Sequence, residues 1–376
     1  EASRILSGKA EQPGFDARST VLSASSIDYL KTLGLWSAMQ PSASPIHHIH
    51  VSDQGHFGGV RMHNSEAGVE ALGHVVENAA IGQALNRALL ANTAVELCAP
   101  VHVSAVTPHL AGMQVQLQAV DEPGQSHTLT AALVVLAEGG RSGLSTQLGI
   151  HLHEQRYGQS AVIANVALSQ PHGGVAHERF TAKGPLALLP LNPHESKQRM
   201  ALVWTQPEDD IAEVMALSDT DCIARLQQDC GHSAGRITHI GKRVVYPLTL
   251  QVAEEQFRPG LVLLGNVAHT LHPVAGQGFN LALRDAMALA ANVRQSLQQQ
   301  LNPGSFARLQ AWWNAVQQDQ ARTITFSDKM TRLFSSNSPT LALLRKFGMA
   351  SLELLPPLKQ QLAQQALGYQ SPGVRL

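Results

Sequence analysis

Glycines and polar side chains gather between residues 261 and 285, and their spacing is the strongest chemical signal in the chain. A short apolar segment ends at Leu264, and a glycine-rich turn follows it. Glycine has no Cβ, so the backbone of such a turn can approach a ligand closely. A helix that begins after the turn would present unpaired N–H groups and the positive end of its dipole, which favours a negatively charged ligand. The residues concerned are Gly265, Asn266, His269, Pro273, Gly276, Gln277, Gly278, Asn280 and Asp285.

A purely structural alternative exists for this stretch, because many α/β proteins contain a strand, a glycine turn and a helix. A lone Gly-x-Gly would favour that alternative. Here the glycines occur together with His, Pro, Asn and Asp inside residues 265–285, so we favour a binding site. His269 is the titratable group within the turn, and we expect it to orient the backbone rather than to act as a base.

The same stretch resembles the second flavin motif of the para-hydroxybenzoate hydroxylase-like FAD monooxygenases, in which Gly-Asp, His, Pro, Gly-Gln-Gly, Asn and Asp follow one another. It is most similar to the ubiquinone-biosynthesis branch of that family. In the family, the aspartate after the first glycine contacts the ribityl chain of the flavin. Asn266 stands at that place here, and its amide oxygen can accept a hydrogen bond from a hydroxyl but carries no charge. The resemblance implies that the helix start at residues 276–280 stabilises the negative edge of a reduced flavin.

Further segments carry the resemblance. Arg18 ends a segment similar to the family's Asp-x-Arg, whose arginine lies beside the flavin, and Gln83 matches a helix glutamine that reaches the ribityl and phosphate region. Residues 136–142 resemble the Ala-Asp-Gly-x-x-Ser motif, which serves FAD and NAD(P)H, with Glu138 in place of the aspartate. From the residues alone, Arg18 could pair with Asp16 or a surface carboxylate, and Gln83 could be a solvated helix residue.

The resemblance extends over nearly the whole chain and implies a reaction, which is hydroxylation of a polyprenylated methoxyphenol with FAD and NAD(P)H as cofactors and without a metal. The alternatives are a sister hydroxylase acting at another ring carbon, a small-phenol hydroxylase, and a non-catalytic scaffold of the ubiquinone-biosynthesis complex. The implied catalytic residues are Pro273, Gly276, Gln277 and Gly278. The implied cofactor-binding residues are Glu1, Arg18, Gln83, Glu138, Gly139, Gly265, Asn266, Gly276, Gly278 and Asn280.

The start of the chain leads to a separate expectation. The family begins with a strand, a Gly-x-Gly-x-x-Gly turn and a helix, and then a second strand that ends in an acidic residue. Glu1 resembles that acid, and no such glycine run lies near it. We therefore expect roughly 30 residues of a βαβ unit to be missing before Glu1. Without the glycine turn the FAD pyrophosphate loses its backbone donors, so we expect the chain as it stands to bind FAD poorly.

The bulk composition limits the classes of protein that fit. Lys and Arg number 27 against 28 Asp and Glu, so the chain lacks the basic surplus of a nucleic-acid-binding protein. Apolar residues make up 44% and charged residues 15%, which provides a core and argues against disorder. Three cysteines cannot form a disulfide framework and fit a reducing compartment. The densest histidine group, at residues 47–50, lacks the spacing of a zinc site, so we interpret it as a polar strand edge.

Membrane contact is expected at the surface rather than through a spanning helix. The chain has no run of about 18 apolar residues. We expect a cytoplasmic protein that lies peripheral to the inner membrane, or binds a ubiquinone-biosynthesis complex, because a polyprenyl phenol is very apolar. Residues 341–367, rich in leucine, could dock on a membrane or a partner. We favour the alternative that they form a helix packed on the FAD domain.

Helical and strand signals are mixed along the chain, which predicts an α/β protein. The resemblance implies a Rossmann-like FAD-binding domain, incomplete at its N-terminus, that is interleaved with a mixed β-sheet substrate domain and followed by C-terminal helices. The predicted FAD-binding domain comprises 1–45, 74–150 and 251–320, the substrate domain 46–73 and 151–250, and the helical region 321–376. Helices are predicted at 19–39, at 78–92 with Asn78 as a cap, and at 276–299, and a hairpin around a turn at 55–59. Strands are predicted at 94–98, 101–107, 113–120, 131–137, 161–168, 200–205 and 261–264.

The substrate pocket is expected between the turn at Pro273–Gly278 and the sheet of the inserted domain. The turn would hold the reactive edge of the cofactor, and the sheet would provide the opposite wall. The candidate wall residues are Phe180, Pro185, Leu186, Ala187 and Trp204.

Overall fold

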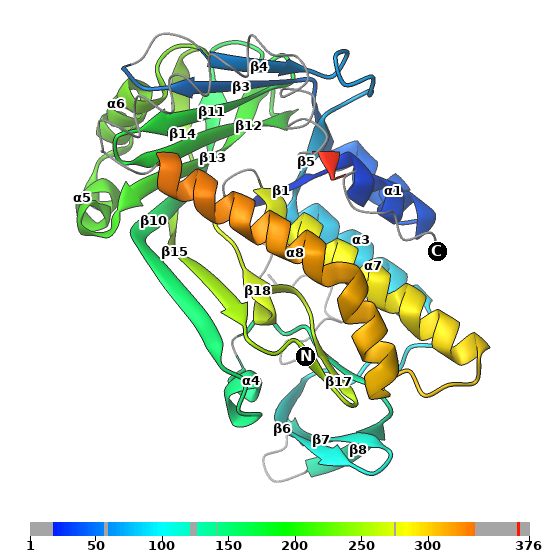
Figure 1. The fold of residues 1–376 in the computed structure, drawn as a ribbon. Coiled ribbons are helices and arrows are strands. Elements are labelled where there is room, and N and C mark those ends of the chain that lie inside the picture. Colours follow the sequence, from blue (N-terminus) through cyan, green and yellow to red (C-terminus); the bar gives the residue numbers. More distant parts are fainter. Residues whose placement is uncertain are drawn as a thin grey trace.

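The computed structural model describes residues 18–55, 59–120, 126–140, 142–273, 276–334 and 367–368. Within them, nine strands form one large sheet at one end of the molecule (Figure 1), in the order β18-β15-β10-β13-β12-β11-β3-β4, with β14 also paired to β10. Its strands are β3 (His48–Asp53), β4 (Gly59–His63), β10 (Leu152–Leu168), β11 (Val175–Thr181), β12 (Gly184–His194), β13 (Lys197–Pro207), β14 (Ile237–Ile240), β15 (Val244–Ala253) and β18 (His269–Thr270).

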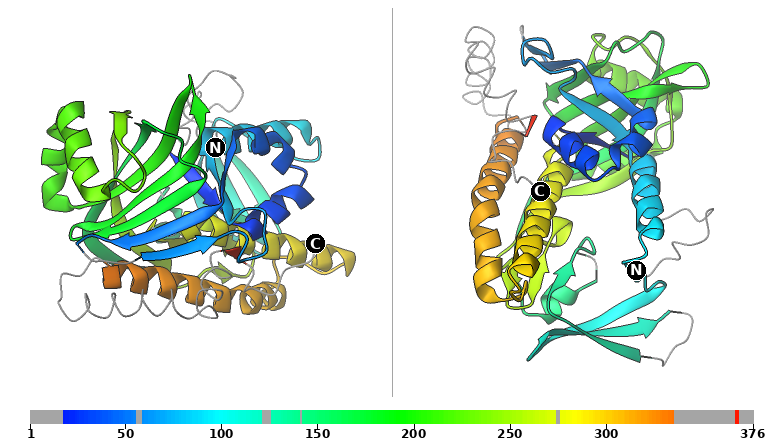
Figure 2. Two further views of the ribbon diagram at one scale, coloured as in Figure 1. Left: turned by 90° about the horizontal axis from the view of Figure 1, so that it is seen from above. Right: turned by 90° about the vertical axis from the view of Figure 1, so that its right-hand side faces the viewer.

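Three smaller sheets and the helices make up the rest of the described structure. In Figures 1 and 2 the β6-β7-β8 sheet lies at the opposite end of the molecule. The first small sheet consists of β1 (Ser19–Leu22), β5 (Gly73–Glu77) and β2 (Ala43–Ile46) in that order. The second consists of β9 (Val134–Leu136), β17 (Leu261–Leu263) and β16 (Phe257–Arg258). The third consists of β6 (Val101–His109), β7 (Gly112–Ala119) and β8 (Ser126–Ala131). The helices are α1 (Ala24–Thr32), α2 (Trp36–Met39), η1 (Gln40–Ser42), α3 (Asn78–Ala91), α4 (Leu144–Gln147), η2 (Glu208–Asp210), α5 (Ile211–Ala216), α6 (Asp219–Cys230), η3 (Gly265–Val267), α7 (Gln277–Gln298) and α8 (Phe306–Phe334).

The two faces of the large sheet have different neighbours, because successive side chains of a strand point to opposite faces. On one face, Leu186 and Trp204 pack in a core with Val214 of α5 and Leu226 of α6. The indole nitrogen of Trp204 donates a hydrogen bond of 2.9 Å to Asp229, also on α6. The other face is therefore the one left for a ligand.

Helices α7 and α8 pack side by side and connect the large sheet to the rest of the molecule (Figure 1). Trp312 of α8 is 1% exposed and packs against Ala288 and Leu289 of α7. No helix in the described part of the chain is long and apolar enough to cross a membrane. The division into domains stays a prediction, although α8 runs without a break across the boundary predicted after residue 320.

Strand β10 runs from the centre of the large sheet toward the end of the molecule that holds β6, β7 and β8 (Figure 1), and it pairs with β15 along both halves. The register of this pair shifts between Arg156 and Ser160, and Gly158 in the gap has a φ of 66°. Tyr157 in the same gap donates a hydrogen bond of 3.0 Å to Asp328 of α8. The interruption is thus held by a side chain from the neighbouring helix.

The helix predicted over residues 19–39 is wrong in its first part. Ser19–Leu22 forms β1, which pairs with β5, and α1 begins only after Ser23, whose side-chain oxygen accepts the N–H of Ser26. Gly34 adopts a φ of 70°, and the chain turns there before α2. The serines near the start are therefore a capping signal and not the first turn of one long helix.

Most other elements occur where the sequence predicts them, with two exceptions. The hairpin of β3 and β4, helix α3 and helix α7 are present. The strand predicted at 94–98 is wrong, because these residues form a turn and irregular backbone. Asn78 does not cap α3, since Glu77 is the N-cap residue, and the Asn78 side chain accepts a hydrogen bond from Thr20 instead. The predicted segment 341–367 lies outside the described residues apart from Leu367.

Candidate functional site

Two of the predicted cofactor motifs meet at one edge of the small parallel pair of strands. β9 and β17 are parallel, with Leu136 opposite Leu263, and each is followed by one of the glycine turns. Because parallel strands end at the same edge of a sheet, the two turns lie side by side. A Cβ added to Gly140 would lie 3.4 Å from the carbonyl oxygen of Asn266. The structure therefore brings residues 138–140 and 265–266 together, as a shared ligand requires.

The two turns leave open space in front of them. Gly139 and Gly265 have φ values of 82° and 69°, and a Cβ at either position would meet no atom within 4 Å. Asn266 and Glu138 are exposed, and a Glu138 oxygen accepts the backbone N–H of Ser142 at 3.2 Å. Exposed polar groups beside an open glycine edge fit a nucleotide cofactor, so this part of the structure is compatible with the predicted FAD.

The start of α7 is built around Gly276. This residue is the N-cap, with a φ of 60°, and its N–H donates a hydrogen bond of 2.9 Å to the carbonyl of Pro273. A Cβ here would lie 3.2 Å from the Cβ of Val21. Gly278 follows inside the helix and faces open space. Pro273, Gly276, Gln277 and Gly278 all line one cavity, so the four predicted catalytic residues face the same space.

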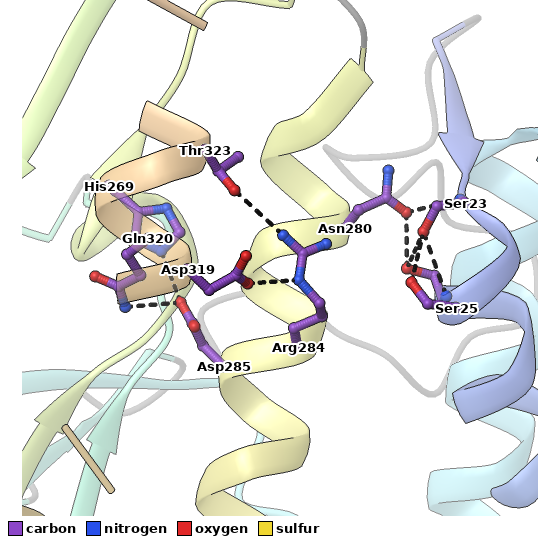
Figure 3. Close-up of polar contacts among 10 residues, drawn as sticks. Ser23, Ser25, His269, Asn280, Arg284, Asp285, Asp319, Gln320 and Thr323 are labelled. Carbon is purple, nitrogen blue, oxygen red and sulfur yellow. Dashed lines mark hydrogen bonds and ion pairs between the residues drawn. The ribbon is translucent and has the colours of Figure 1, made fainter. Parts of the chain in front are cut away.

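Asn280 fixes this helix start to the neighbouring strand and helix (Figure 3). Its Nδ2 donates to the carbonyls of Val21 at 2.8 Å and Gly276 at 2.9 Å. Its Oδ1 accepts the backbone N–H of Ser23 at 2.9 Å and the hydroxyl of Ser26 at 2.7 Å. These four bonds use the donors and acceptors of the amide fully. The Asn280 side chain therefore positions the turn, and its predicted contact with a cofactor stays a prediction.

A second buried cluster holds the other face of α7 (Figure 3). The Asp285 carboxylate lies 2.9 Å from Nε2 of His269 and accepts a hydrogen bond of 2.9 Å from Gln320 of α8. Burial raises the pKa of the Asp285 carboxyl. His269 is 2% exposed and does not line the cavity, so it ties the turn to α7 and α8. The adjacent residue in α7, Arg284, forms an ion pair of 2.7 Å with Asp319 of α8, which the sequence did not indicate.

A cavity of about 430 Å³ lies between the start of α7 and the free face of the large sheet, where the pocket was predicted. Phe326 and Met330 of α8 form part of its wall. Of the predicted wall residues, Phe180 and Ala187 line it. Pro185, Leu186 and Trp204 do not, and for Leu186 and Trp204 the reason is strand alternation, which points them into the core on the opposite face.

The remaining predicted cofactor residues lie in different places. Arg18 lines the cavity, and its guanidinium carbon is 4.8 Å from the centre of the Tyr246 ring. Gln83 is exposed on α3 and does not line the cavity. Glu1 and Asp16 lie outside the described residues. The cavity wall thus joins Arg18 to the α7 turn, and it leaves Gln83 apart from both.

Sequence analysis missed three titratable residues of the cavity wall, which are His177, Glu178 and His272. Burial raises the pKa of Glu178 to about 7 and lowers that of His272 to about 4. The ring of His272 packs edge-on against Tyr157, with the ring centres 5.3 Å apart. Glu178 could have been found from alternation, because it shares a strand face with the apolar Ala176 and Phe180.

Alanine substitutions at the two glycines of the turn are expected to separate folding from cofactor binding. Gly276→Ala should lower the free energy of unfolding by about 1–2 kcal/mol, because it forces a Cβ into the left-handed region and against Val21. Gly278→Ala should leave stability unchanged or raise it by up to about 1 kcal/mol, since alanine favours the helix. Its methyl group would project into the cavity and lower FAD occupancy.

Urea unfolding and the flavin absorbance of the purified full-length variants measure the two effects. Full FAD occupancy in a stable Gly278→Ala protein would show that the turn does not face the cofactor.

Comparison with known proteins agrees with this geometry. Residues 5–316 match the family model described as "FAD binding domain". The ubiquinone hydroxylase UbiL of Rhodospirillum rubrum is 33% identical over 356 residues, which cover 94% of this chain and 80% of that protein. The 3-demethoxyubiquinol 3-hydroxylase of Escherichia coli is 29% identical over 360 residues, covering 94% and 88%. The crystal structure of PqsL, a probable FAD-dependent monooxygenase from Pseudomonas aeruginosa, superposes with a TM-score of 0.74 at 18% identity, covering 89% of this chain and 90% of that one.

These similarities confirm the predicted fold class and cofactor. FAD is the cofactor of the matching family, and NAD(P)H is the usual electron donor. The match extends over more than three quarters of the chain and includes both glycine turns and the start of α7. The protein is a flavin-dependent monooxygenase of the aromatic hydroxylase type, and the chain belongs to the FAD binding domain family.

Proposed function

We propose that this protein hydroxylates the ring of a polyprenylated methoxyphenol in ubiquinone biosynthesis. The observation that carries the proposal is the cavity of about 430 Å³ between the α7 turn and an apolar sheet face. Its volume lies within the range of about 300–1,000 Å³ that small-molecule sites occupy. Relatives named for hydroxylation in ubiquinone biosynthesis, and similar over nearly the whole chain, support this substrate class.

One side of the cavity binds the cofactor, and the other side orients the phenol ring. When bound, FAD accepts reducing equivalents from NAD(P)H and activates oxygen for transfer to the ring. The N-terminus of α7 directs backbone N–H groups and a positive dipole end toward the negative charge of the reduced cofactor. The apolar sheet face packs against the phenol ring and excludes water from the reacting atoms.

The prenyl tail requires an apolar path out of the cavity, toward a membrane surface or a protein of the same pathway. Leu367 is 3% exposed and packs with Ile46 and Leu72, which line the cavity. We propose that Ile46 and Leu72, with which Leu367 packs, contact the tail where it leaves the cavity. The proposed substrate class does not depend on this contact.

Turnover by the FAD-loaded full-length enzyme tests the proposed function. A methoxyphenol with a short prenyl chain should be hydroxylated, with NAD(P)H consumption matched by dihydroxylated product in mass spectrometry. Its kcat/KM should exceed that of unprenylated methoxyphenol at least about tenfold, because buried apolar surface stabilises the complex by about 25 cal/mol per Å².

Three outcomes would contradict the proposal or its details. A preference for unprenylated phenols would indicate a small-phenol hydroxylase. Hydroxylation of a different pathway phenol, at another ring carbon, in preference to the methoxyphenol would indicate a sister enzyme of the pathway. The quinone intermediate that accumulates in a deletion strain gives the same information. A folded, FAD-loaded enzyme that hydroxylates none of these compounds would favour a scaffold.

A further inference from the structure

Glu178 lies in the middle of the apolar wall that faces the turn of α7. Its strand, β11, is flanked by β3 and β12, which place Val51 and Ala187 directly opposite it. The same row continues through Val60 on one side and Val203 on the other. All of these neighbours line the cavity and are apolar. A carboxyl group in such a row serves neither sheet packing nor solubility.

No hydrogen bond or ion pair joins Glu178 to another residue in the part of the chain that the structure describes. Desolvation alone raises the pKa of its carboxyl, to about 7. Burying a carboxyl without a partner is unfavourable, and such groups concentrate at functional sites. The position of Glu178 on a substrate-sized cavity provides a function for it.

The other titratable groups on the cavity wall do not neutralise Glu178. Arg18 stacks on Tyr246. His177 precedes Glu178 in β11, and its ring lies 5.6 Å from that of His50. His272 has a pKa lowered to about 4 by burial, so it is neutral near pH 7. From α8, Phe326 and Met330 face the cavity without charge.

We propose that Glu178 is the base that accepts the phenolic proton of the substrate during ring hydroxylation. The phenolic O–H bond breaks, the proton moves to a carboxylate oxygen of Glu178, and the electron pair stays on the phenol oxygen. This electron pair increases the electron density of the ring carbons ortho and para to that oxygen, one of which forms the new C–O bond. The oxygen atom of the new bond comes from O2, which NAD(P)H reduces through FAD, and the second oxygen atom leaves as water. As the ring becomes aromatic again, the C–H bond at the hydroxylated carbon breaks and its proton ends in that water. Glu178 returns its own proton to the phenol oxygen, so it ends the cycle as it began.

This proposal rests on the proposed function only for the phenolic nature of the substrate. It requires that a carboxylate and a phenol oxygen come within hydrogen-bond reach inside the cavity. A base is most effective when its pKa lies near the working pH, and general base catalysis contributes about 10²–10⁴-fold. Glu178 fits that requirement, whereas a solvent-exposed glutamate would be too weak a base.

Glu178→Gln tests the proposal, because it keeps the shape and polarity of the side chain but cannot accept the proton. In the FAD-loaded full-length enzyme, kcat for the methoxyphenol should fall about 100-fold. For a polyfluorinated phenol that is already ionised at pH 8, kcat should fall less than about tenfold. The rise of wild-type kcat with pH near 7 should disappear in this variant. Glu178→Asp should keep that rise at a lower kcat, since it retains a carboxylate.

Binding to the oxidised enzyme without NAD(P)H gives a readout that does not depend on turnover. The wild-type carboxylate should repel the ionised polyfluorinated phenol at pH 8, and Glu178→Gln should bind it at least about tenfold more tightly, by calorimetry. The matched control is Glu195→Gln, an exposed glutamate between β12 and β13, which should change neither binding nor kcat.

Each further outcome decides the matter. Equal losses for both phenols, or equal losses in Glu178→Gln and Glu178→Asp, would show a structural role and overturn the proposal. So would a Glu178→Gln enzyme within about threefold of wild type. If the wild-type enzyme hydroxylates no phenol, the proposed function fails, whereas the binding experiment still decides whether Glu178 faces the phenol oxygen.

Discussion

Replacing Asp285 with alanine is expected to lower the free energy of unfolding by about 3–5 kcal/mol, because it breaks a buried charged cluster by removing one partner. Asp285 is 1% exposed, and it accepts hydrogen bonds from His269 and Gln320, which are both 2% exposed. In the variant, these two groups would remain buried without their acceptor. The turn of β18, helix α7 and helix α8 would lose their shared contact.

Urea denaturation of the purified protein at pH 7 measures this effect. Asp209→Ala is the matched control, since Asp209 is exposed in η2, just before α5, and its removal should change stability by no more than about 0.5 kcal/mol. Asp285→Asn should cost less than the alanine variant, because an amide oxygen can still accept a hydrogen bond. A loss below about 1 kcal/mol for Asp285→Ala would show that the cluster does not hold the helices together.

The second large effect concerns the pH dependence of stability at Glu178. The folded pKa of about 7 exceeds the ordinary value of 4.5, so between these pH values the folded protein binds more protons at this site than the unfolded chain. Stability must therefore fall as the pH rises through this window. From 4.5 to about 7 is a difference of about 2.5, which corresponds to about 3 kcal/mol.

Glu178→Gln removes this dependence. The free energy of unfolding of the variant should therefore exceed that of wild type by about 3 kcal/mol more at pH 8 than near pH 4.5. Urea unfolding of the substrate-free protein at both pH values measures the difference. His177 and His272 also titrate below pH 7, but they are present in both proteins and their contributions cancel. A stability difference that is independent of pH would show that Glu178 is not buried in the folded protein.

The local signals in the sequence were enough to locate the turn of the site. Gly265 and Gly276 stand where a positive φ favours glycine, Gly278 faces open space, and the glycine spacing is visible without any knowledge of the fold. The apolar segments around them predicted β17 and α7 within a residue or two.

Contacts between distant segments could not be predicted in the same way. The polar role of Asn280 depends on Val21 and Ser23, which lie more than 250 residues away in the sequence. The choice between Ala187 and Trp204 as wall residues depends on which face of the sheet meets α6, and periodicity gives alternation without giving that choice. Glu178 could not be predicted for both reasons, because its place on the cavity depends on which face of the sheet is free and on the distant segments that form the opposite wall.

The gap in the β10–β15 ladder determines where the molecule can bend. No rung joins the two strands between Arg156 and Ser160, so a change of angle at this point breaks no backbone pairing. Resistance to bending comes instead from Tyr157 on Asp328, which is 21% exposed. Gln155 also contacts Asp328, and Arg332 of α8 donates a hydrogen bond of 2.6 Å to Gln155. Because Phe326 and Met330 of α8 line the cavity, these side chains connect the interruption in β10 to the cavity wall, so a rotation of the two halves of β10 would move that wall.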